Sequence, residues 1–351
     1  MKEKVLMKGN EAIAEAAVRG GCRYFFGYPI TPQNEIPEYL SVRLPEVGGT
    51  FIQSESEVSA INMVYGAAAA GARAMTSSSS PGISLKQEGI SYIACAELPC
   101  VIVNMVRGGP GLGSIYPGQA DYFQSVKGGG HGDYKLLVYT PATVQEAVDI
   151  AYKAFDVADK YRIPVMILGD GTLGQMMEPV CLPEMKDPKT FVSKKWAASG
   201  CENREKNVIN TLEMNPDKLE AITDRLFDTF EKVRKNEVMS EEYLCADAEY
   251  IFVAFGIVSR IAKTAVNILR ESGIKAGLFR PITVSPFPDK ALKKLTEGNV
   301  KKLIVAELNK GQMVEDVRLT VNGVKPVECF GRTGGNLMTS EDLVALIKGG
   351  K

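Results

Sequence analysis

The sequence predicts an α/β protein in which a parallel sheet is covered by helices on both faces. Over residues 1–180, short apolar runs alternate with helical stretches, as in strands joined by crossover helices. The alternation resumes at Tyr250, after a segment at 181–245 that is richer in charge and proline. With 351 residues, the chain can form two domains. We expect one domain at 1–182, a helical connector at 183–245 and a second domain at 246–351.

In the N-terminal half, a first helix can start at Asn10, whose amide suits an N-cap, and end at the Gly20-Gly21 pair. Pro81 suits the first turn of a later helix. Helical stretches are expected at 58–70 and 144–159, between apolar runs that we interpret as strands: 24–26, 50–52, 74–76, 101–106, 136–139 and 165–168.

The connector should contain one amphipathic helix, because its apolar residues follow helical spacing: Leu219, Ile222, Leu226, Phe230 and Val233. In the C-terminal half, strands are expected at 251–255, 276–279, 303–306 and 326–329. Helices should start at Ser259, at Asp289 and near Ser340, which is a plausible N-cap.

Charge and leader signals exclude several classes of protein. A net charge of −1 gives no electrostatic reason to bind nucleic acid or a membrane surface. The first residues carry no signal-peptide pattern, and no apolar run is long enough to span a bilayer. We expect a cytoplasmic protein.

Cysteine spacing argues against a metal centre built by this chain alone. None of the seven cysteines forms a Cys-x-x-Cys pair, and His131 is the single histidine. Buried, reduced thiols are the expected state. No metal ligands are therefore predicted, and neither His131 nor the glycine-rich loop at 108–113 receives a role from the sequence.

Two prolines stiffen the loop that follows the strand at 24–26. Residues 27–32 read Gly-Tyr-Pro-Ile-Thr-Pro, and Pro29 and Pro32 restrict their own φ and the residues before them. The loop presents the hydroxyl of Thr31 at a strand end, where α/β folds place ligand contacts. From the residues alone, a rigid turn explains the segment equally well.

Charged or hydroxyl side chains follow three further strands. Glu55 and Glu57 precede a helix, where the helix dipole alone would favour a carboxylate. Arg107 can bind a carboxylate through two hydrogen bonds or form an ordinary surface ion pair. The serine run at 77–80 can face a ligand or be a solvated loop.

The segment Tyr28-Pro29-Ile30-Thr31-Pro32 resembles the substrate loop in the α component of 2-oxoacid:ferredoxin oxidoreductases. These enzymes use thiamine diphosphate to decarboxylate 2-oxo acids oxidatively to acyl-CoA. Segments at 273–283, 286–288 and 305–313 resemble the transketolase C-terminal-like domain of the same subunits. The resemblance covers nearly the whole chain. It implies a thiamine diphosphate-binding fold, with a pyrimidine-binding domain first and a transketolase C-terminal-like domain second.

The resemblance also implies residue roles. Glu57 is the catalytic group that faces the cofactor's aminopyrimidine, because its spacing to Gly66-Ala67 resembles that in other thiamine enzymes. Glu55 could exchange roles with it through an alignment offset of two residues. Arg107 holds the substrate carboxylate, and Tyr28, Pro29, Ile30 and Thr31 contact the substrate. Ser79, Ser80 and Gly82 complete the cofactor-binding set.

Gly169-Asp170-Gly171 resembles the start of the magnesium–diphosphate motif of thiamine enzymes, but the asparagine pair that completes it is missing. The family resemblance thus implies thiamine diphosphate shared with a β-type subunit that carries the diphosphate and Mg²⁺. It places [4Fe-4S] clusters on partner subunits, with γ and ferredoxin-like subunits completing a hetero-oligomer.

The implied reaction uses a 2-oxo acid, CoA and ferredoxin. The N-terminal pattern is most similar to subunits that act on branched-chain 2-oxo acids, so 3-methyl-2-oxobutanoate is the expected substrate. Alternatives are a pyruvate- or 2-oxoglutarate-specific member, a self-sufficient thiamine enzyme, and a non-catalytic scaffold that binds partners.

Overall fold

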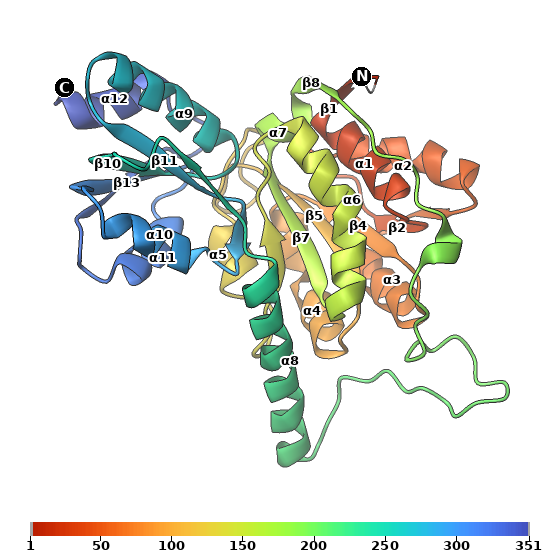
Figure 1. Cartoon of the computed structure of the whole chain (residues 1–351). Coiled ribbons are helices and arrows are strands. Elements are labelled where there is room, and N and C mark those ends of the chain that lie inside the picture. Colours follow the sequence, from red (N-terminus) through yellow and green to blue (C-terminus); the bar gives the residue numbers. More distant parts are fainter. Residues whose placement is uncertain (1–2, 350–351) are drawn as a thin grey trace.

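Two largely parallel sheets, each covered by helices, make up the computed structural model, which describes residues 3–349 (Figure 1). The predicted α/β fold is confirmed. The larger sheet has seven strands in the order β12-β6-β7-β5-β4-β2-β3, and the smaller has five in the order β14-β13-β10-β11-β9. The predicted domain boundaries stay a prediction.

Six strands of the larger sheet run parallel: β2 (Tyr24–Gly27), β3 (Thr50–Gln53), β4 (Ala74–Ser78), β5 (Cys100–Val106), β6 (Leu137–Tyr139) and β7 (Pro164–Asp170). β12 (Thr283–Ser285), from the C-terminal half of the chain, pairs antiparallel with β6 at one edge. Neighbouring side chains enter opposite cores, since Phe25 packs in one apolar cluster and Phe26 in the other.

Helices cover both faces of the larger sheet. On one face lie α1 (Gly9–Arg19), α2 (Glu35–Glu46) and α6 (Val144–Tyr161), and on the other lie α3 (Glu57–Ala69) and α4 (Pro81–Cys95). The chain passes from β2 to its neighbour β3, then crosses to β4 on the other side of β2. This change of direction makes a topological switch point, where α/β folds bind ligands at the carboxyl ends of the strands.

The first helix corrects one expectation. Asn10 lies inside α1, which begins at Gly9 with Lys8 at the N-cap position. The Asn10 amide donates instead to the carbonyl of Pro32, at 2.8 Å, and to Glu35 Oε2, at 2.8 Å. The amide therefore anchors the loop after β2 rather than the start of the helix.

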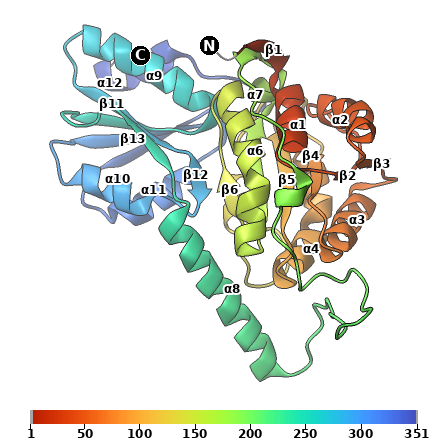
Figure 2. The same ribbon diagram turned by 45° about the vertical axis from the view of Figure 1, so that its right-hand side comes forward.

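A small antiparallel sheet joins two segments that the sequence left unassigned, β1 (Val5–Lys8) and β8 (Met177–Val180). β8 follows α7 (Gly171–Gln175), the short helix after β7. Beyond β8, the short 3-10 helix at Pro188–Thr190 is the one regular element before α8 (Pro216–Asn236). α8 confirms the expected amphipathic helix, but only its later turns are covered, with Phe230 and Val233 buried and Leu219 exposed. Figures 1 and 2 show its first turns standing away from both sheets.

The smaller sheet combines four parallel strands, β10 (Tyr250–Val253), β11 (Ala276–Pro281), β13 (Lys302–Glu307) and β14 (Val327–Gly331), with an antiparallel edge strand, β9 (Ser240–Tyr243). α9 (Gly256–Glu271) and α12 (Ser340–Lys348) cover one face, and α10 (Asp289–Thr296) and α11 (Met313–Val321) cover the other (Figure 1). α9 begins at Gly256 rather than at Ser259. α12 begins at Ser340 as expected, but its N-cap is Thr339, whose hydroxyl accepts from the amide of Asp342.

The two parts of the molecule share one apolar core and polar contacts. One buried cluster contains both Ile102 of β5 and Val305 of β13. The Tyr122 hydroxyl, in α5 (Tyr122–Val126), donates to Asp316 of α11 at 2.6 Å. No helix within residues 3–349 combines the length and apolar character needed to cross a bilayer.

Candidate active site

Four strand ends bring the predicted residues to one edge of the larger sheet. The Thr31 loop follows β2, Glu57 follows β3, the serine run closes β4 and Arg107 follows β5. Because these strands are parallel neighbours, their carboxyl ends meet at the same edge. The edge coincides with the switch point between β2 and β4.

Side chains of two other helices anchor the loop after β2. The Pro32 carbonyl accepts hydrogen bonds from Asn10 and from Gln175 Nε2, the latter at 3.0 Å, and Gln33 is fully buried. Tyr28, Pro29 and Thr31 are exposed, and Ile30 is half-buried. The loop therefore presents these side chains from an anchored base.

Glu57 and Glu55 occupy opposite environments. Glu57 is the first residue of α3 and is buried, whereas Glu55 is exposed in the turn before it. Ser56 serves as the N-cap, because its hydroxyl accepts from the amide of Ser59 at 3.2 Å. The capping role that could have explained Glu57 is thus filled by another residue.

Gly82 leaves the space that the Glu57 carboxylate uses. A Cβ atom at Gly82 would lie 2.6 Å from Glu57 Oε1 and 2.1 Å from Ser78 Oγ. The hydroxyls of Ser78 and Ser79 are buried and have no hydrogen-bond partner among residues 3–349. Unpaired buried hydroxyls are costly in a folded protein, so this cluster is suited to a polar ligand.

Arg107 connects three loops at the edge. It is buried, and it donates through Nη1 to the Thr31 carbonyl at 3.0 Å and through Nη2 to the Leu112 carbonyl at 2.7 Å. Its amide donates to Ser80 Oγ at 3.1 Å. Nε is buried without a partner in the described chain. The surface ion pair that the sequence allowed is not formed by the described residues, and three of the five N–H donors have no partner among residues 3–349.

Lys86 is a site residue that the sequence analysis missed. Its side chain is fully buried, and Nζ donates to Thr76 Oγ1 at 3.1 Å and to the Glu57 carbonyl at 3.5 Å. Burial lowers the pKa of the Lys86 ammonium to about 7, while the negative charge of Glu57 opposes the shift. A signal was present in the sequence, because Lys86 interrupts the apolar stripe Ile83, Ile90 and Ile93 of α4.

His131 lies apart from this cluster, whereas Asp170 ends β7 beside Val106 of β5 and uses its carboxylate within the fold. The buried Asp170 carboxylate accepts from the amides of Thr172 and Leu173 at 2.9 and 3.0 Å and from Ile257 at 3.3 Å. Burial raises its pKa, although these hydrogen bonds act against the shift. His131 is exposed, and its carbonyl accepts from Ser91, well along α4 from Gly82. No group of three or more His, Cys, Asp or Glu within residues 3–349 could hold a metal ion.

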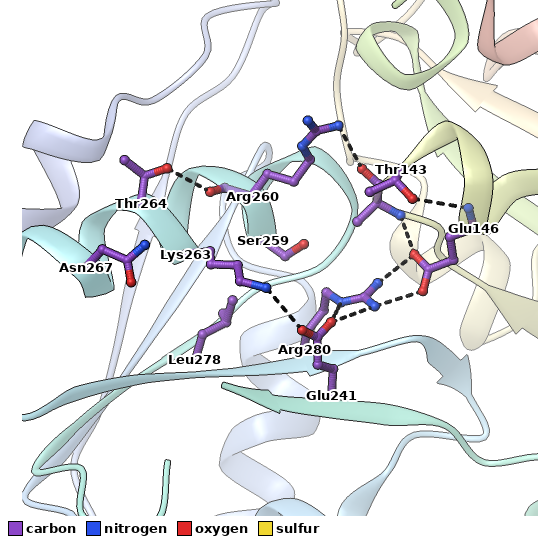
Figure 3. A pocket seen from close by; sticks show the side chains of 11 residues that line it. Thr143, Glu146, Glu241, Ser259, Arg260, Lys263, Thr264, Asn267, Leu278 and Arg280 are labelled. Carbon is purple, nitrogen blue, oxygen red and sulfur yellow. Dashed lines mark hydrogen bonds and ion pairs between the residues drawn. The ribbon is translucent and has the colours of Figure 1, made fainter. Parts of the chain in front are cut away.

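Two cavities lie between the larger and smaller sheets. One, of about 470 Å³, adjoins Ser80 and is lined by loop residues 109–111 and by Asn309, Lys310 and Gln312. Another, of about 500 Å³, lies between α6, α9, β9 and β11 (Figure 3). In the second cavity the charges satisfy one another, since Arg280 pairs with Glu146 and Glu241 (Figure 3). We therefore place the candidate site at the strand ends, where buried polar atoms lack partners.

Comparison with protein families covers most of the chain. Residues 15–242 match the family described as pyruvate flavodoxin/ferredoxin oxidoreductase, thiamine diphosphate-binding. Residues 248–343 match pyruvate:ferredoxin oxidoreductase core domain II. The chain is 49% identical over 343 residues to the ketoisovalerate oxidoreductase subunit VorB of Methanothermobacter marburgensis, covering 98% of this chain and 97% of that protein.

This chain belongs to the 2-oxoacid:ferredoxin oxidoreductase family. The resemblance seen in the sequence is confirmed, and with it the thiamine diphosphate-binding fold. Another member of the family, the 2-oxoglutarate synthase subunit KorA of Methanocaldococcus jannaschii, is 38% identical to this chain. The aligned region covers 98% of this chain and 99% of that protein.

Solved structures of known proteins share the architecture. A 2-oxoglutarate:ferredoxin oxidoreductase from Magnetococcus marinus, with 2-oxoglutarate, coenzyme A and succinyl-CoA bound, superposes with a TM-score of 0.89 at 26% identity, over 99% of this chain. This chain spans 65% of that longer chain. A split-gene transketolase in an inactive tetrameric form shares the fold, with a TM-score of 0.61 at 15% identity, over 98% of each chain. The roles of individual residues in this family member stay predictions.

Proposed function

We propose that this chain is the α-type subunit of a 2-oxoacid:ferredoxin oxidoreductase that acts on 3-methyl-2-oxobutanoate. The carboxylate of the 2-oxo acid leaves as CO₂, and the remaining acyl group forms a thioester with the sulfur of CoA. The two electrons of the broken carbon–carbon bond pass to ferredoxin, and the proton of the CoA thiol is released. The supporting observation is the buried Glu57 carboxylate packed against Gly82 beside two unpaired serine hydroxyls, at the switch point of the sheet.

The residues present fit the aminopyrimidine end of thiamine diphosphate. Glu57 offers a buried carboxylate that can hold a proton at, or accept a hydrogen bond from, the pyrimidine ring nitrogen. Ser78 and Ser79 offer unpaired hydroxyls, and Gly82 leaves room for the carboxylate. When bound, the cofactor would supply a carbon nucleophile for the 2-oxo group. Cofactor-facing roles are accordingly proposed for Glu57, Ser79, Ser80 and Gly82, with Glu55 as the alternative carboxylate.

Arg107 and the Thr31 loop are suited to the 2-oxo acid itself. Two donors of the guanidinium hold the Thr31 and Leu112 carbonyls, which leaves Nε and the remaining Nη protons for the substrate carboxylate. The same bonds fix the distance between the Thr31 loop and the glycine-rich loop. Thr31 would then orient the oxo group, with Tyr28, Pro29 and Ile30 around it.

Exposed apolar side chains in the loop after Arg107 support the proposal of a branched-chain substrate. Leu112, Ile115 and Tyr116, in the loop that Arg107 holds, are 79%, 59% and 62% exposed and can pack on an isopropyl group. Identity to the VorB subunit, at 49%, exceeds that to the KorA subunit, at 38%. 2-Oxoglutarate is the second candidate, because Lys310 in the adjoining cavity is a cation that a second carboxylate could reach.

Partners complete the proposed enzyme. A β-type subunit would hold the diphosphate and Mg²⁺, and γ and ferredoxin-like subunits would carry the [4Fe-4S] clusters that accept the electrons. VorB and KorA are each named as subunits, which supports a multi-subunit assembly. This chain would then contribute the pyrimidine and substrate side of a shared site.

The test is to purify this chain with its genomic neighbours and to assay CoA-dependent dye reduction with 3-methyl-2-oxobutanoate, 2-oxoglutarate and pyruvate. We expect the highest kcat/KM for the branched-chain acid. A preference for 2-oxoglutarate or pyruvate would keep the reaction and correct the substrate. A complex that binds thiamine diphosphate yet oxidises none of the three would favour a non-catalytic scaffold.

A further inference from the structure

Lys86 is a buried cation that the proposed chemistry does not use. It lies fully buried on α4, and no carboxylate of residues 3–349 comes within ion-pair distance of its Nζ. Burying an ammonium without a paired carboxylate is costly, and neighbouring positions on this face of α4 are isoleucines. A methionine or leucine would pack there without that cost. We therefore expect the lysine at position 86 to have a function beyond packing.

The contacts of Lys86 all lead to the base of the candidate site. Nζ donates to Thr76 Oγ1 in β4 and to the carbonyl of Glu57 at the start of α3. The carboxylate of the same residue, Glu57, packs against Gly82, which lies one turn before Lys86 on α4. Lys86 thus ties together the three elements that frame the carboxylate.

Charge couples the two residues as well. Among the titratable groups of residues 3–349, Glu57 is the one whose charge acts on Lys86, and Thr76 is a neutral neighbour. An anion near a buried ammonium favours the charged lysine, which opposes the effect of burial on Lys86. The low dielectric of the interior strengthens this attraction.

We propose that Lys86 is a positioning residue for Glu57, which holds the first turn of α3 against β4 and so fixes where the Glu57 carboxylate meets the pyrimidine ring. The inference rests on the proposed role of Glu57 and extends it to a residue that touches neither cofactor nor substrate.

The coupling can be measured in the cofactor-free full-length chain. Lysines labelled with ¹³C at Cε are titrated by NMR, and the Lys86 signal is assigned by its loss in Lys86→Met. Lys86 should titrate near neutral pH, far below the ordinary lysine value of about 10.4. In Glu57→Gln its midpoint should fall by about one pH unit or more, because the attracting anion is gone. An unchanged midpoint in Glu57→Gln, or a Lys86 that titrates like a surface lysine, would overturn the proposal.

The second arm uses the assembled complex and the dissociation constant of thiamine diphosphate. Lys86→Met should weaken cofactor binding about tenfold, equivalent to about 1.4 kcal/mol. The pH profile of activity should also lose its dependence on a group that titrates near neutral pH, because Lys86 is absent. In a Glu57→Gln background, Lys86→Met should add no further loss of affinity. The matched control is Lys194→Met, which removes another half-buried lysine that pairs with Asp159, and it should leave affinity and profile unchanged.

The outcomes separate the two claims. If Glu57→Gln itself leaves cofactor affinity and turnover intact, the proposed function fails. If Glu57→Gln is damaging but the Lys86→Met loss is undiminished in the Glu57→Gln background, Lys86 is a structural support only and this inference alone is wrong.

Discussion

At the scale of single residues, the account depends on which of two carboxylates enters the site. Glu55 and Glu57 lie two positions apart, and the sequence left open an exchange of their roles. The structure buries Glu57 and exposes Glu55, because the helix cap falls on Ser56 and turns the next side chain inward. Position relative to the cap therefore favours Glu57.

Glu57→Gln should preserve folding and assembly while lowering turnover by orders of magnitude, since the amide cannot hold a proton at the pyrimidine nitrogen. Hydrogen–deuterium exchange at the thiazolium carbon should slow in parallel. Glu55→Gln is the matched control and should stay close to wild type. Loss of turnover in Glu55→Gln with normal Glu57→Gln would show that the assignment is displaced by two residues.

Arg107→Met should lower kcat/KM for the 2-oxo acid at least about tenfold, or about 1.4 kcal/mol, because a buried charge-assisted pair to a carboxylate is lost. Thiamine diphosphate should remain bound, as measured by its dissociation constant. Arg225→Met, which removes an exposed arginine that pairs with Glu97, is the control. An unchanged kcat/KM for every 2-oxo acid would remove Arg107 from the site.

At the scale of elements, the packing of α3 against α4 shapes the pocket for Glu57. Gly82→Ala should disturb it, because the added Cβ would overlap Ser78 Oγ and Glu57 Oε1. We expect a fall in the free energy of unfolding of about 1–3 kcal/mol and weaker cofactor binding. Calorimetry of the chain and cofactor titration of the complex measure the two effects.

Gly66→Ala is the control for this prediction. Gly66 lies on α3, and outside its own helix backbone no heavy atom of residues 3–349 comes within 4 Å of the position that an added methyl group would take. Alanine should therefore be neutral or should stabilise the isolated chain by up to about 1 kcal/mol through helix propensity. Equal behaviour of Gly82→Ala and Gly66→Ala would contradict the close packing around Glu57.

The sequence predicted the parallel strands of both sheets and missed short antiparallel strands such as β8 and β9. β5 and β7 are buried throughout, and their continuous apolar runs identify them. β9 reads Ser-Glu-Glu-Tyr and β8 contains Pro179, so neither shows an apolar strand pattern. Edge strands such as these are specified by the partner they meet rather than by their own residues.

Part of the candidate site could be predicted from the sequence, and part depends on contacts between distant segments. Thr31, Glu57 and Arg107 could be predicted because each follows a recognisable strand. Lys86 and Asn10 act from inside helices, on segments far away in sequence, through contacts that only the packed fold creates.

At the scale of the whole molecule, the smaller sheet closes over the same edge that carries the site. The Gln119 side chain donates to the Phe255 carbonyl and accepts from the Leu308 amide, both at 3.0 Å, so the segment after the glycine-rich loop is held by both parts. Glu57, Arg107 and the Thr31 loop meet at this edge because they follow neighbouring parallel strands. The diphosphate end of the cofactor is left, in our proposal, to a partner subunit.

The shared site is the central claim, and the most direct measurement compares the chain alone with the chain expressed beside its partners. Bound thiamine diphosphate, visible absorbance and dye reduction with a 2-oxo acid are recorded for both. We predict that the isolated chain binds cofactor weakly, shows no iron–sulfur absorbance and reduces no dye, and that the complex binds cofactor tightly, shows that absorbance and reduces the dye. Tight cofactor binding or dye reduction by the isolated chain would contradict the shared site and indicate a self-sufficient thiamine enzyme.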